Sequence, residues 1–167
     1  DARATRARRP ACAEIAVWRA PRFATRDAGA AAYAGASVEH GARVSSRVLR
    51  QLEKKHADVT SSGLGSNGAK AIAVGVAENA TMESLNVSRN RIDDDGVSAL
   101  CAAAARATAL RALNFSENKV SSAIAPTYEE AVKRIKVLNF SACGVDDACA
   151  KALFAALRND GCRLESL

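Results

Sequence analysis

A run of three aspartates at residues 93–95 is the densest cluster of potential metal ligands in this 167-residue chain. Clustered carboxylates suit hard divalent cations. Segments at equivalent spacing elsewhere hold Ser-Asn at 66–67, Ser-Ser at 121–122 and Asp-Asp at 146–147. Short polar side chains cap the free amides at the start of a helix, and negative charge there suits the helix dipole. This position therefore favours capping, and we expect no metal site.

Histidine and glycine motifs give no further sign of catalysis. The chain has two histidines, His40 and His56, and no motif places a Ser or Cys nucleophile beside either. The glycines at 63, 65 and 68 lack the Lys-Ser or Lys-Thr that follows in a phosphate-binding loop. We therefore expect no catalytic residue, no cofactor and no enzymatic activity.

The five cysteines are odd in number and show neither a C-x-x-C pair nor Cys/His spacing for zinc. Three fall at apolar positions of the pattern described below, where Cys behaves as a small hydrophobe. This usage is typical of a reduced intracellular protein, and we expect a cytoplasmic location. The cysteines are Cys12, Cys101, Cys143, Cys149 and Cys162.

Charge is unevenly distributed along the chain. The net charge is +6, yet residues 1–50 hold ten Arg against four acids, and residues 51–167 balance their basic and acidic residues. A nucleic-acid interface needs Lys and Arg clustered on one folded face. We expect no nucleic acid to bind the balanced region. No apolar run approaches the roughly 20 residues that span a bilayer, so we expect no membrane span.

An apolar ladder recurs along the balanced region. It starts at Met82 (MESLNVSRNRI), returns 28 residues later at Leu110 (LRALNFSENKV) and 25 residues after that at Ile135 (IKVLNFSACGV). A weaker copy places Ala57 and Val59 at ladder positions. Apolar residues held in register at this period indicate stacked repeats.

Each ladder is followed by a helical pattern. Gly96, Leu100 and Ala104 recur at intervals of four residues, which predicts a helix that buries one stripe. Each unit is therefore a short strand, a turn and a helix. The third unit differs, because Pro126 interrupts its helix and Thr127 opens a capping box for a shorter one.

The pattern L-x-x-L-x-L-x-x-[N/C]-x-L, followed by x-x-x-G-x-x-x-L-x-x-x-L, resembles the leucine-rich repeat of the ribonuclease-inhibitor type. About 115 residues carry it, best over 82–104 and 135–157. This type also occurs in NOD-like receptors and Ran GTPase-activating protein. The resemblance implies an α/β solenoid of about four repeats, a horseshoe segment with parallel strands on the concave face and helices on the convex face.

These patterns divide the chain into three parts. Residues 1–44 form an Ala/Arg-rich leader that we expect to be disordered, with a transit peptide or a linker as alternatives. Residues 45–56 are expected to form a capping helix, because Val48, Leu49 and Leu52 share one helical face. Residues 57–167 hold the repeats. The final Leu164-Glu-Ser-Leu167 opens another ladder, so we expect a fragment of a longer array.

Two sets of residues follow from the repeat. The structural ladder should bury its apolar residues, and its Asn or Cys should satisfy the turn after each strand. This ladder comprises Leu85, Val87, Asn90, Leu113, Phe115, Asn118, Leu138, Phe140 and Cys143. Residues between the ladder positions point away from the core and, with the loops beyond, form the candidate partner-binding surface. That surface comprises Ser84, Asn86, Ser88, Arg89, Arg91, Asn114, Ser116, Glu117, Lys119, Asn139 and Ser141.

Three functions fit these expectations. The first is a non-enzymatic scaffold that binds another protein through the concave face. The second, by fold analogy with Ran GTPase-activating protein, is a regulator of a small GTPase. The third is a ciliary or cytoskeletal structural subunit. The polar residues of the concave face could also serve only to keep an open sheet soluble.

Overall fold

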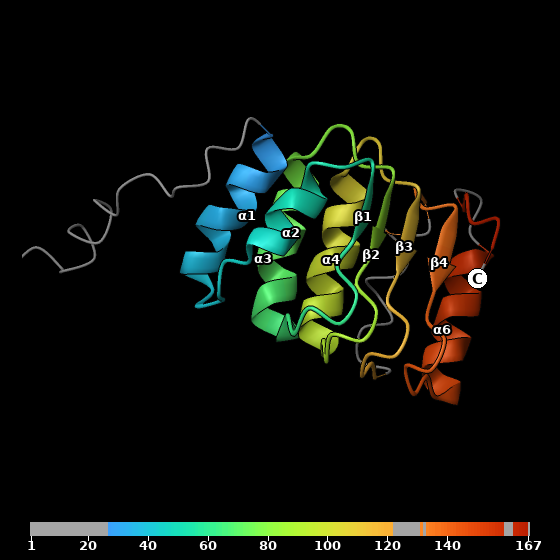
Figure 1. Cartoon of the computed structure of the whole chain (residues 1–167). Coiled ribbons are helices and arrows are strands. Elements are labelled where there is room, and N and C mark those ends of the chain that lie inside the picture. The colour runs from blue at the N-terminus through green and yellow to red at the C-terminus, as the bar shows by residue number, and fades with distance from the viewer. Residues whose placement is uncertain (1–26, 122–130, 132, 159–161, 167) are drawn as a thin grey trace, which may run out of the picture.

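The structure, a computed structural model, describes residues 27–121, 131, 133–158 and 162–166. Short strands alternate with helices along most of this range (Figure 1). The elements are α1 (Ala28–Glu39), α2 (Ser46–Leu52), β1 (His56–Asp58), α3 (Gly65–Glu78), β2 (Ser84–Asn86), α4 (Asp94–Arg106), β3 (Ala112–Asn114), β4 (Val137–Asn139) and α6 (Asp147–Leu157).

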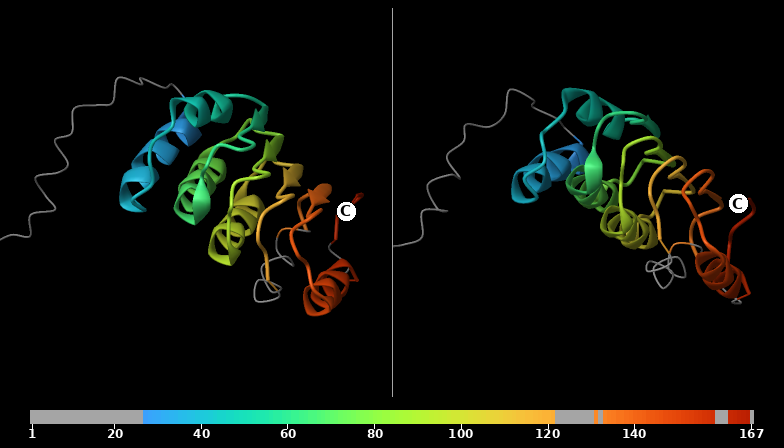
Figure 2. Two further views of the ribbon diagram at one scale, coloured as in Figure 1. Left: turned by 60° about the horizontal axis from the view of Figure 1, so that its bottom comes forward. Right: turned by 90° about the horizontal axis from the view of Figure 1, so that it is seen from below.

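The strands form one four-stranded parallel sheet in the order of the sequence. Ala57, Leu85, Leu113 and Leu138 stand opposite one another in register. Parallel neighbours need a crossover connection, which α3 and α4 supply between the first three strands. Figure 2 shows α3, α4 and α6 on one face of the sheet, while no helix of the described residues lies on the other face. The units of β1, β2 and β4 therefore each consist of one strand followed by one helix, as expected from the sequence.

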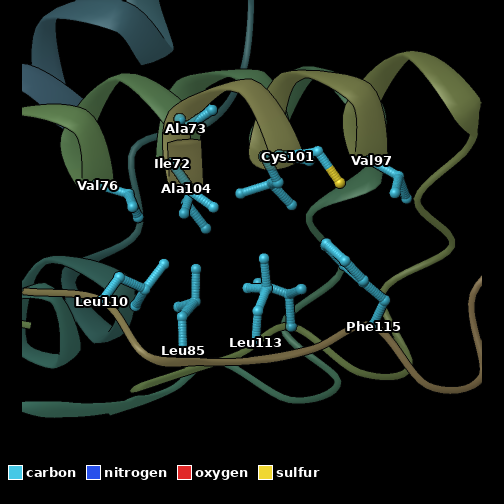
Figure 3. Packing of buried hydrophobic residues seen from close by; sticks show 14 of the residues in the cluster. Ile72, Ala73, Val76, Leu85, Val97, Cys101, Ala104, Leu110, Leu113 and Phe115 are labelled. Carbon is cyan, nitrogen blue, oxygen red and sulfur yellow. The ribbon is translucent and has the colours of Figure 1, made fainter. Parts of the chain in front are cut away.

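The core lies between the strand layer and the helix layer. Leu85, Leu113 and Phe115 point from the strand side toward Ile72 and Cys101 on the helices (Figure 3). All five side chains are buried. A fully buried aliphatic or aromatic side chain of this kind contributes roughly 1.5–3 kcal/mol. One continuous core cluster contains residues of all four strands and of α3, α4 and α6.

Asn90 closes the turn after β2, as expected. Its Oδ1 accepts hydrogen bonds from the backbone amides of Ser62 (2.7 Å) and Leu64 (3.4 Å) in the preceding unit. Its Nδ2 donates to the carbonyls of Val59 and Val87, both at 2.9 Å. Because the side chain is only 1% exposed, these bonds replace water for backbone groups that would otherwise be unsatisfied.

The next two units repeat this arrangement. Asn118 Oδ1 accepts from the amides of Asn90 and Ile92, both at 3.0 Å, and its Nδ2 donates to Phe115 O at 2.7 Å. In the fourth unit Cys143 Sγ donates to the same Phe115 carbonyl at 3.3 Å. A thiol thus supplies one of the bonds that the carboxamide makes in the other units.

Residues 28–39 form helix α1, although residues 1–44 were expected to be disordered. Residues 1–26 lie outside the described residues, so the correction concerns the end of this range. Asp27 caps α1 by accepting from Ala30 N at 2.9 Å. The Ala-rich sequence has high helix propensity, and α1 packs along α3. Regular structure therefore begins earlier in the chain than the hydrophobic pattern suggests.

Two glycines bring α1 and α3 into close contact. A Cβ placed on Gly29 would lie 2.5 Å from Gly75 O, and one on Gly75 would lie 2.7 Å from Gly29 O. Tyr33, one turn further along α1, is buried beside Gly75. The close approach of the two backbones requires the absence of a side chain at both glycines.

Helix α2 covers the start of the core, but it ends at Leu52 and not at residue 56 as expected. Ser45 caps it through Val48 N at 3.5 Å. The helix ends early because the following backbone joins the sheet: Lys55 O accepts from Glu83 N at 2.7 Å, and His56 begins β1. Pairing with β2 overrides the helical pattern of this short segment.

Buried Asn79 connects α1, α2 and β2 and has no counterpart in the later repeats. Its Nδ2 donates to Leu52 O at 2.8 Å and to Asp27 Oδ1 at 3.3 Å. Its Oδ1 accepts from Met82 N at 2.7 Å. One carboxamide thus connects both helices of the N-terminal cap to the first full repeat.

The third and last units are described in part. The helix expected after Pro126 lies outside the described residues, apart from buried Ala131. The ladder at the end of the sequence does pair with β4, because Leu138 N donates to Ser166 O at 3.1 Å and Val137 bridges to Ser166 in parallel. In the described part of the chain, no helix combines the length and apolar character needed to cross a membrane.

Candidate functional site

The face of the sheet opposite the helices, here called the open face, carries most of the predicted partner-binding residues. Its side chains form three rows across the strands. The first row is His56, Ser84, Ala112 and Val137; the second is Asp58, Asn86, Asn114 and Asn139; the third is Thr60, Ser88, Ser116 and Ser141. The in-register pairing of the strands aligns each row, with about 4.8 Å between neighbours.

Every member of the second row makes the same local hydrogen bond. Oδ1 of each residue accepts from the backbone amide two residues further on. The distances are 3.0 Å at Asp58, 3.1 Å at Asn86, 2.9 Å at Asn114 and 2.8 Å at Asn139. These four Asx turns end the strands in the same way. Asn86, Asn114 and Asn139 were predicted as part of a recognition surface, but the Oδ1 of each has a structural role.

The Asx turn fixes which way each carboxamide points. A backbone N–H only donates, so the oxygen of the amide must face it and the nitrogen must face away. Among the described residues, Nδ2 of Asn86, Asn114 and Asn139 donates no hydrogen bond. All three side chains are half-buried. The second row therefore presents three outward amide donors and, on β1, the carboxylate of Asp58.

The first row changes from polar to apolar along the sheet. His56 Nδ1 and Ser84 Oγ lie 2.9 Å apart, within hydrogen-bonding distance. Ala112 and Val137 follow, and Val137 is 43% exposed. The surface beside the later amide donors is therefore aliphatic.

The third row contributes less than expected. Ser88 was predicted to be exposed, but it is 6% exposed, and its Oγ lies 3.2 Å from Thr60 Oγ1. Ser88 lies in the turn that Asn90 closes, where Asn90 Nδ2 donates to Ser88 O at 3.0 Å. Thr60 and Ser116 are half-buried and Ser141 is exposed. The Thr60 hydroxyl donates to Asp58 Oδ1 at 2.6 Å, so the hydroxyls that this row offers to a partner are those of Ser116 and Ser141.

The predicted charged residues lie on the loops beyond the strands. Arg89 Nη2 and Glu117 Oε1 form an ion pair at 2.7 Å across two units. Arg91 and Lys119 occupy equivalent positions in the same units, are exposed, and form no ion pair with any described residue. Two cations on this edge of the open face thus remain available to a partner.

Asp58 and Glu83 are held as carboxylates. The hydroxyl and then the amide of Thr60 donate to Asp58 and lower its pKa, with a smaller contribution from the charge of Arg47. Lys55 lowers the pKa of Glu83 through a hydrogen bond at 3.1 Å. Both groups are therefore ionised at neutral pH and place negative charge on this surface.

The predicted ladder residues lie in the core. Phe140 is the exception, because it is only half-buried and stacks on Phe115 with 5.4 Å between ring centroids. The residues that are buried are Leu85, Val87, Asn90, Leu113, Phe115, Asn118, Leu138 and Cys143. Their roles are to fill the core and to close the turns.

The three aspartates at residues 93–95 serve three structural contacts. Asp93 caps α4 by accepting from Gly96 N at 3.2 Å, and a hydrogen bond with Ser66 lowers its pKa. Asp94 accepts from the amide and hydroxyl of Ser121 in the next unit. Asp95 pairs with Lys70 at 2.8 Å. Within the described residues, no three His, Cys, Asp or Glu side chains gather as metal ligands would.

The sequence reasoning missed the contribution of β1. Asp58, His56 and Thr60 extend all three rows by one strand, although the ladder of this unit is weak. The signal was the offset of 28 residues that separates Asp58 from Asn86. The ladder of this unit was recognised at Ala57 and Val59, but the offset was not applied to the side chains between them.

The in-register parallel strands, the helix layer on one face and the side-chain ladder together define a leucine-rich repeat solenoid. In agreement, a family model described as "Leucine Rich repeat" matches residues 78–101, which hold the Met82 ladder and most of α4. The search of curated proteins found no match.

Among solved structures, the chain is similar to one described as "Leiomodin-1 Actin-Binding Site 2 (ABS2)". The TM-score is 0.49 at 14% sequence identity, over 64% of this chain and 67% of that one. This similarity does not identify what the present chain binds.

Proposed function

We propose that this protein is a non-enzymatic interaction module that binds another protein through the open face of its sheet. The observation that carries the proposal is the asymmetry of the sheet. Helices cover one face and bury its apolar residues, while the other face presents aligned, half-exposed polar side chains. A fixed row of hydrogen-bonding groups on a rigid scaffold is suited to recognition.

We also propose that the repeats are of the ribonuclease-inhibitor type. The support is the long unit of 28 residues and a full α-helix in each described crossover. Asn90, Asn118 and Cys143 occupy the turn position where this type holds Asn or Cys.

A photo-crosslinking experiment tests the binding face. A benzophenone amino acid replaces Ala112 on β3 in one variant and Ala102 on α4 in a matched control, since both are alanines accessible to solvent. With a partner isolated by the intact protein, we expect adducts from position 112 and few from position 102. Hydrogen exchange on the same complex should show protection over β2–β4. Adducts confined to position 102, with protection of the helices, would refute the proposal.

The regulation of a small GTPase stays a prediction without a structural observation in its favour. Single-turnover GTP hydrolysis by candidate GTPases, with and without the protein, would test it. An unchanged hydrolysis rate would remove this alternative.

A further inference from the structure

The second row of the open face differs chemically between its β1 end and its β4 end. Asp58, Asn86, Asn114 and Asn139 stand in register on β1–β4 and share the Asx turn. In each, Oδ1 is bound to its own turn, so the outer atom decides what a partner meets. This outer atom is a carboxylate oxygen on β1 and an amide nitrogen on the three later strands.

We infer that strands β2–β4 bind an acidic helix of a partner protein, whose carboxylates accept hydrogen bonds from Asn86, Asn114 and Asn139. This inference rests on the proposed function and specifies the chemistry of the partner. Outward amide N–H groups need acceptors, and ionised Asp and Glu side chains are acceptors that form stronger, charge-assisted hydrogen bonds.

Charge around the row supports an acidic partner. Arg91 and Lys119 lie on the loops beyond β2 and β3 and form no ion pair with any described residue. The neighbouring Glu117 is already paired with Arg89 at 2.7 Å. Asp58 places negative charge at the β1 end, which disfavours an acidic segment there and sets its register toward β4.

Spacing favours a helix over an extended peptide. Three strands separated by about 4.8 Å place the first and third amides about 10 Å apart. Residues i and i+7 of a helix are about 10.5 Å apart, whereas alternate residues of an extended chain repeat at about 6.8 Å and overshoot the row. Helical carboxylates at i, i+3 or i+4, and i+7 therefore match all three donors.

The first row supplies an apolar contact beside the donors. Ala112 and Val137 lie on β3 and β4, and Val137 is 43% exposed. An aliphatic residue next to the acidic stripe of the helix would cover this surface. The fitting partner is thus an amphipathic acidic helix, and not a uniformly charged tail.

A titration with matched peptides tests the inference on the full chain. The probe is an alanine-rich helical peptide of about 16 residues with Glu at i, i+4 and i+7 and one adjacent Leu. Its controls carry Gln or Lys in place of Glu. The readout is the side-chain NH2 signals of Asn86, Asn114 and Asn139 in nitrogen-15 correlation spectra. We expect the Glu peptide to shift all three signals and to bind about tenfold tighter than the Gln peptide, a difference typical of charge-assisted hydrogen bonds.

Variants of the protein make the test specific. Asn114→Asp keeps the Asx turn, as native Asp58 does, and exchanges the outward donor for a charged acceptor. This substitution should weaken binding of the Glu peptide about tenfold. Asn67→Asp makes the same chemical change on an exposed residue of α3 and should leave binding within about twofold, since exposed charges at a distance are screened. Asp58→Asn should strengthen binding.

Equal binding of the Glu and Gln peptides, tighter binding of the Lys peptide, or no shift of the three signals would each overturn the inference. These outcomes are distinguishable from failure of the proposed function. Crosslinking from position 112 to a natural partner reports the binding face whether or not the partner is acidic.

Discussion

Asn86 and Asn90 lie four residues apart and have opposite roles. Asn90 is buried, and all its polar atoms bind backbone groups of two repeats. Asn86 is half-buried, uses its oxygen in one local turn and leaves its nitrogen outward. The difference follows from the strand: Asn86 belongs to it and faces away from the core, whereas Asn90 follows the turn and points back into it.

Replacing Asn90 by alanine should therefore cost far more than replacing Asn86. Asn90→Ala leaves buried donors and acceptors of both repeats unpaired, which should lower the free energy of unfolding by about 2–4 kcal/mol. Asn86→Ala loses one local bond that water can replace, for about 1 kcal/mol or less. Urea denaturation of both variants gives the comparison. Equal losses would show that Asn90 does not hold the repeats together.

Arg91 and Lys119 occupy the same repeat position with different backbones. Arg91 has a φ of 55°, and the equivalent Gly63 and Gly144 have φ values of 64° and 75°, whereas Lys119 does not share this left-handed conformation. A non-glycine residue there is strained by about 1 kcal/mol.

Arg91→Gly should consequently preserve or raise the free energy of unfolding, by up to about 1 kcal/mol. Lys119→Gly should lower it by about 0.5–1 kcal/mol, because the unfolded chain gains freedom and no strain is relieved. Thermal denaturation of the matched pair measures both changes. Similar destabilisation by the two substitutions would contradict the role of φ at residue 91.

The sequence predicts residue roles where the repeat constrains them. The buried ladder and the turn function of Asn90 follow from register alone, because equivalent positions must solve the same packing problem. The direction of the Asn86 amide does not follow, because it depends on a hydrogen bond to the backbone of Ser88. The burial of Ser88 does not follow either, because Ser88 lies in the turn beyond β2, where the alternation of a strand no longer applies.

At the scale of elements, α1 shows where hydrophobic periodicity fails. Its contact with α3 is formed by glycine and alanine, together with Tyr33. Such residues give little contrast between an apolar and a polar face, so a buried helix resembles low-complexity sequence. The close contact of backbones, and not a stripe of large side chains, fixes α1 in place.

Gly75→Ala should test this contact, because its new methyl group would lie 2.7 Å from Gly29 O. The helices would have to separate, at a cost of about 1–3 kcal/mol. Gly35→Ala is the control: nothing lies within 4 Å of its Cβ position, and higher helix propensity should stabilise α1 by about 0.5–1 kcal/mol. Urea denaturation of both variants measures the stability. Opposite signs for the two variants are expected, and a loss in both would argue against close packing.

For the whole molecule, the fold was predictable because every unit repeats the same evidence. Strand, turn and helix were each weak as single predictions, but three copies in register left one consistent architecture. The ends of the array lack this support. Accordingly, the sequence predicts the buried residues of α2, which are Val48, Leu49 and Leu52. It does not predict α1 or the connection of the two helices through Asn79.

The cap should decide whether the array folds as one unit. Described contacts begin at Asp27, so a chain without residues 1–25 keeps all of them and serves as the reference. Removing residues 1–44 deletes α1, uncovers the face of α3 that carries Gly75, and breaks the 3.3 Å hydrogen bond from Ser45 N to the Tyr33 hydroxyl. Solenoids depend on their terminal caps, and the loss of a buried tyrosine and its neighbours should cost about 3–5 kcal/mol.

Far-UV circular dichroism during urea denaturation of the two truncated chains measures this difference. We expect the shorter chain to unfold at a lower urea concentration and over a broader range, because repeats that contact only their neighbours lose cooperativity from an exposed end. The variant Tyr33→Ala in the full chain loses only the packing of Tyr33. Its urea midpoint should lie between those of the two truncated chains. Identical transitions for both truncated chains would show that α2 by itself closes the core.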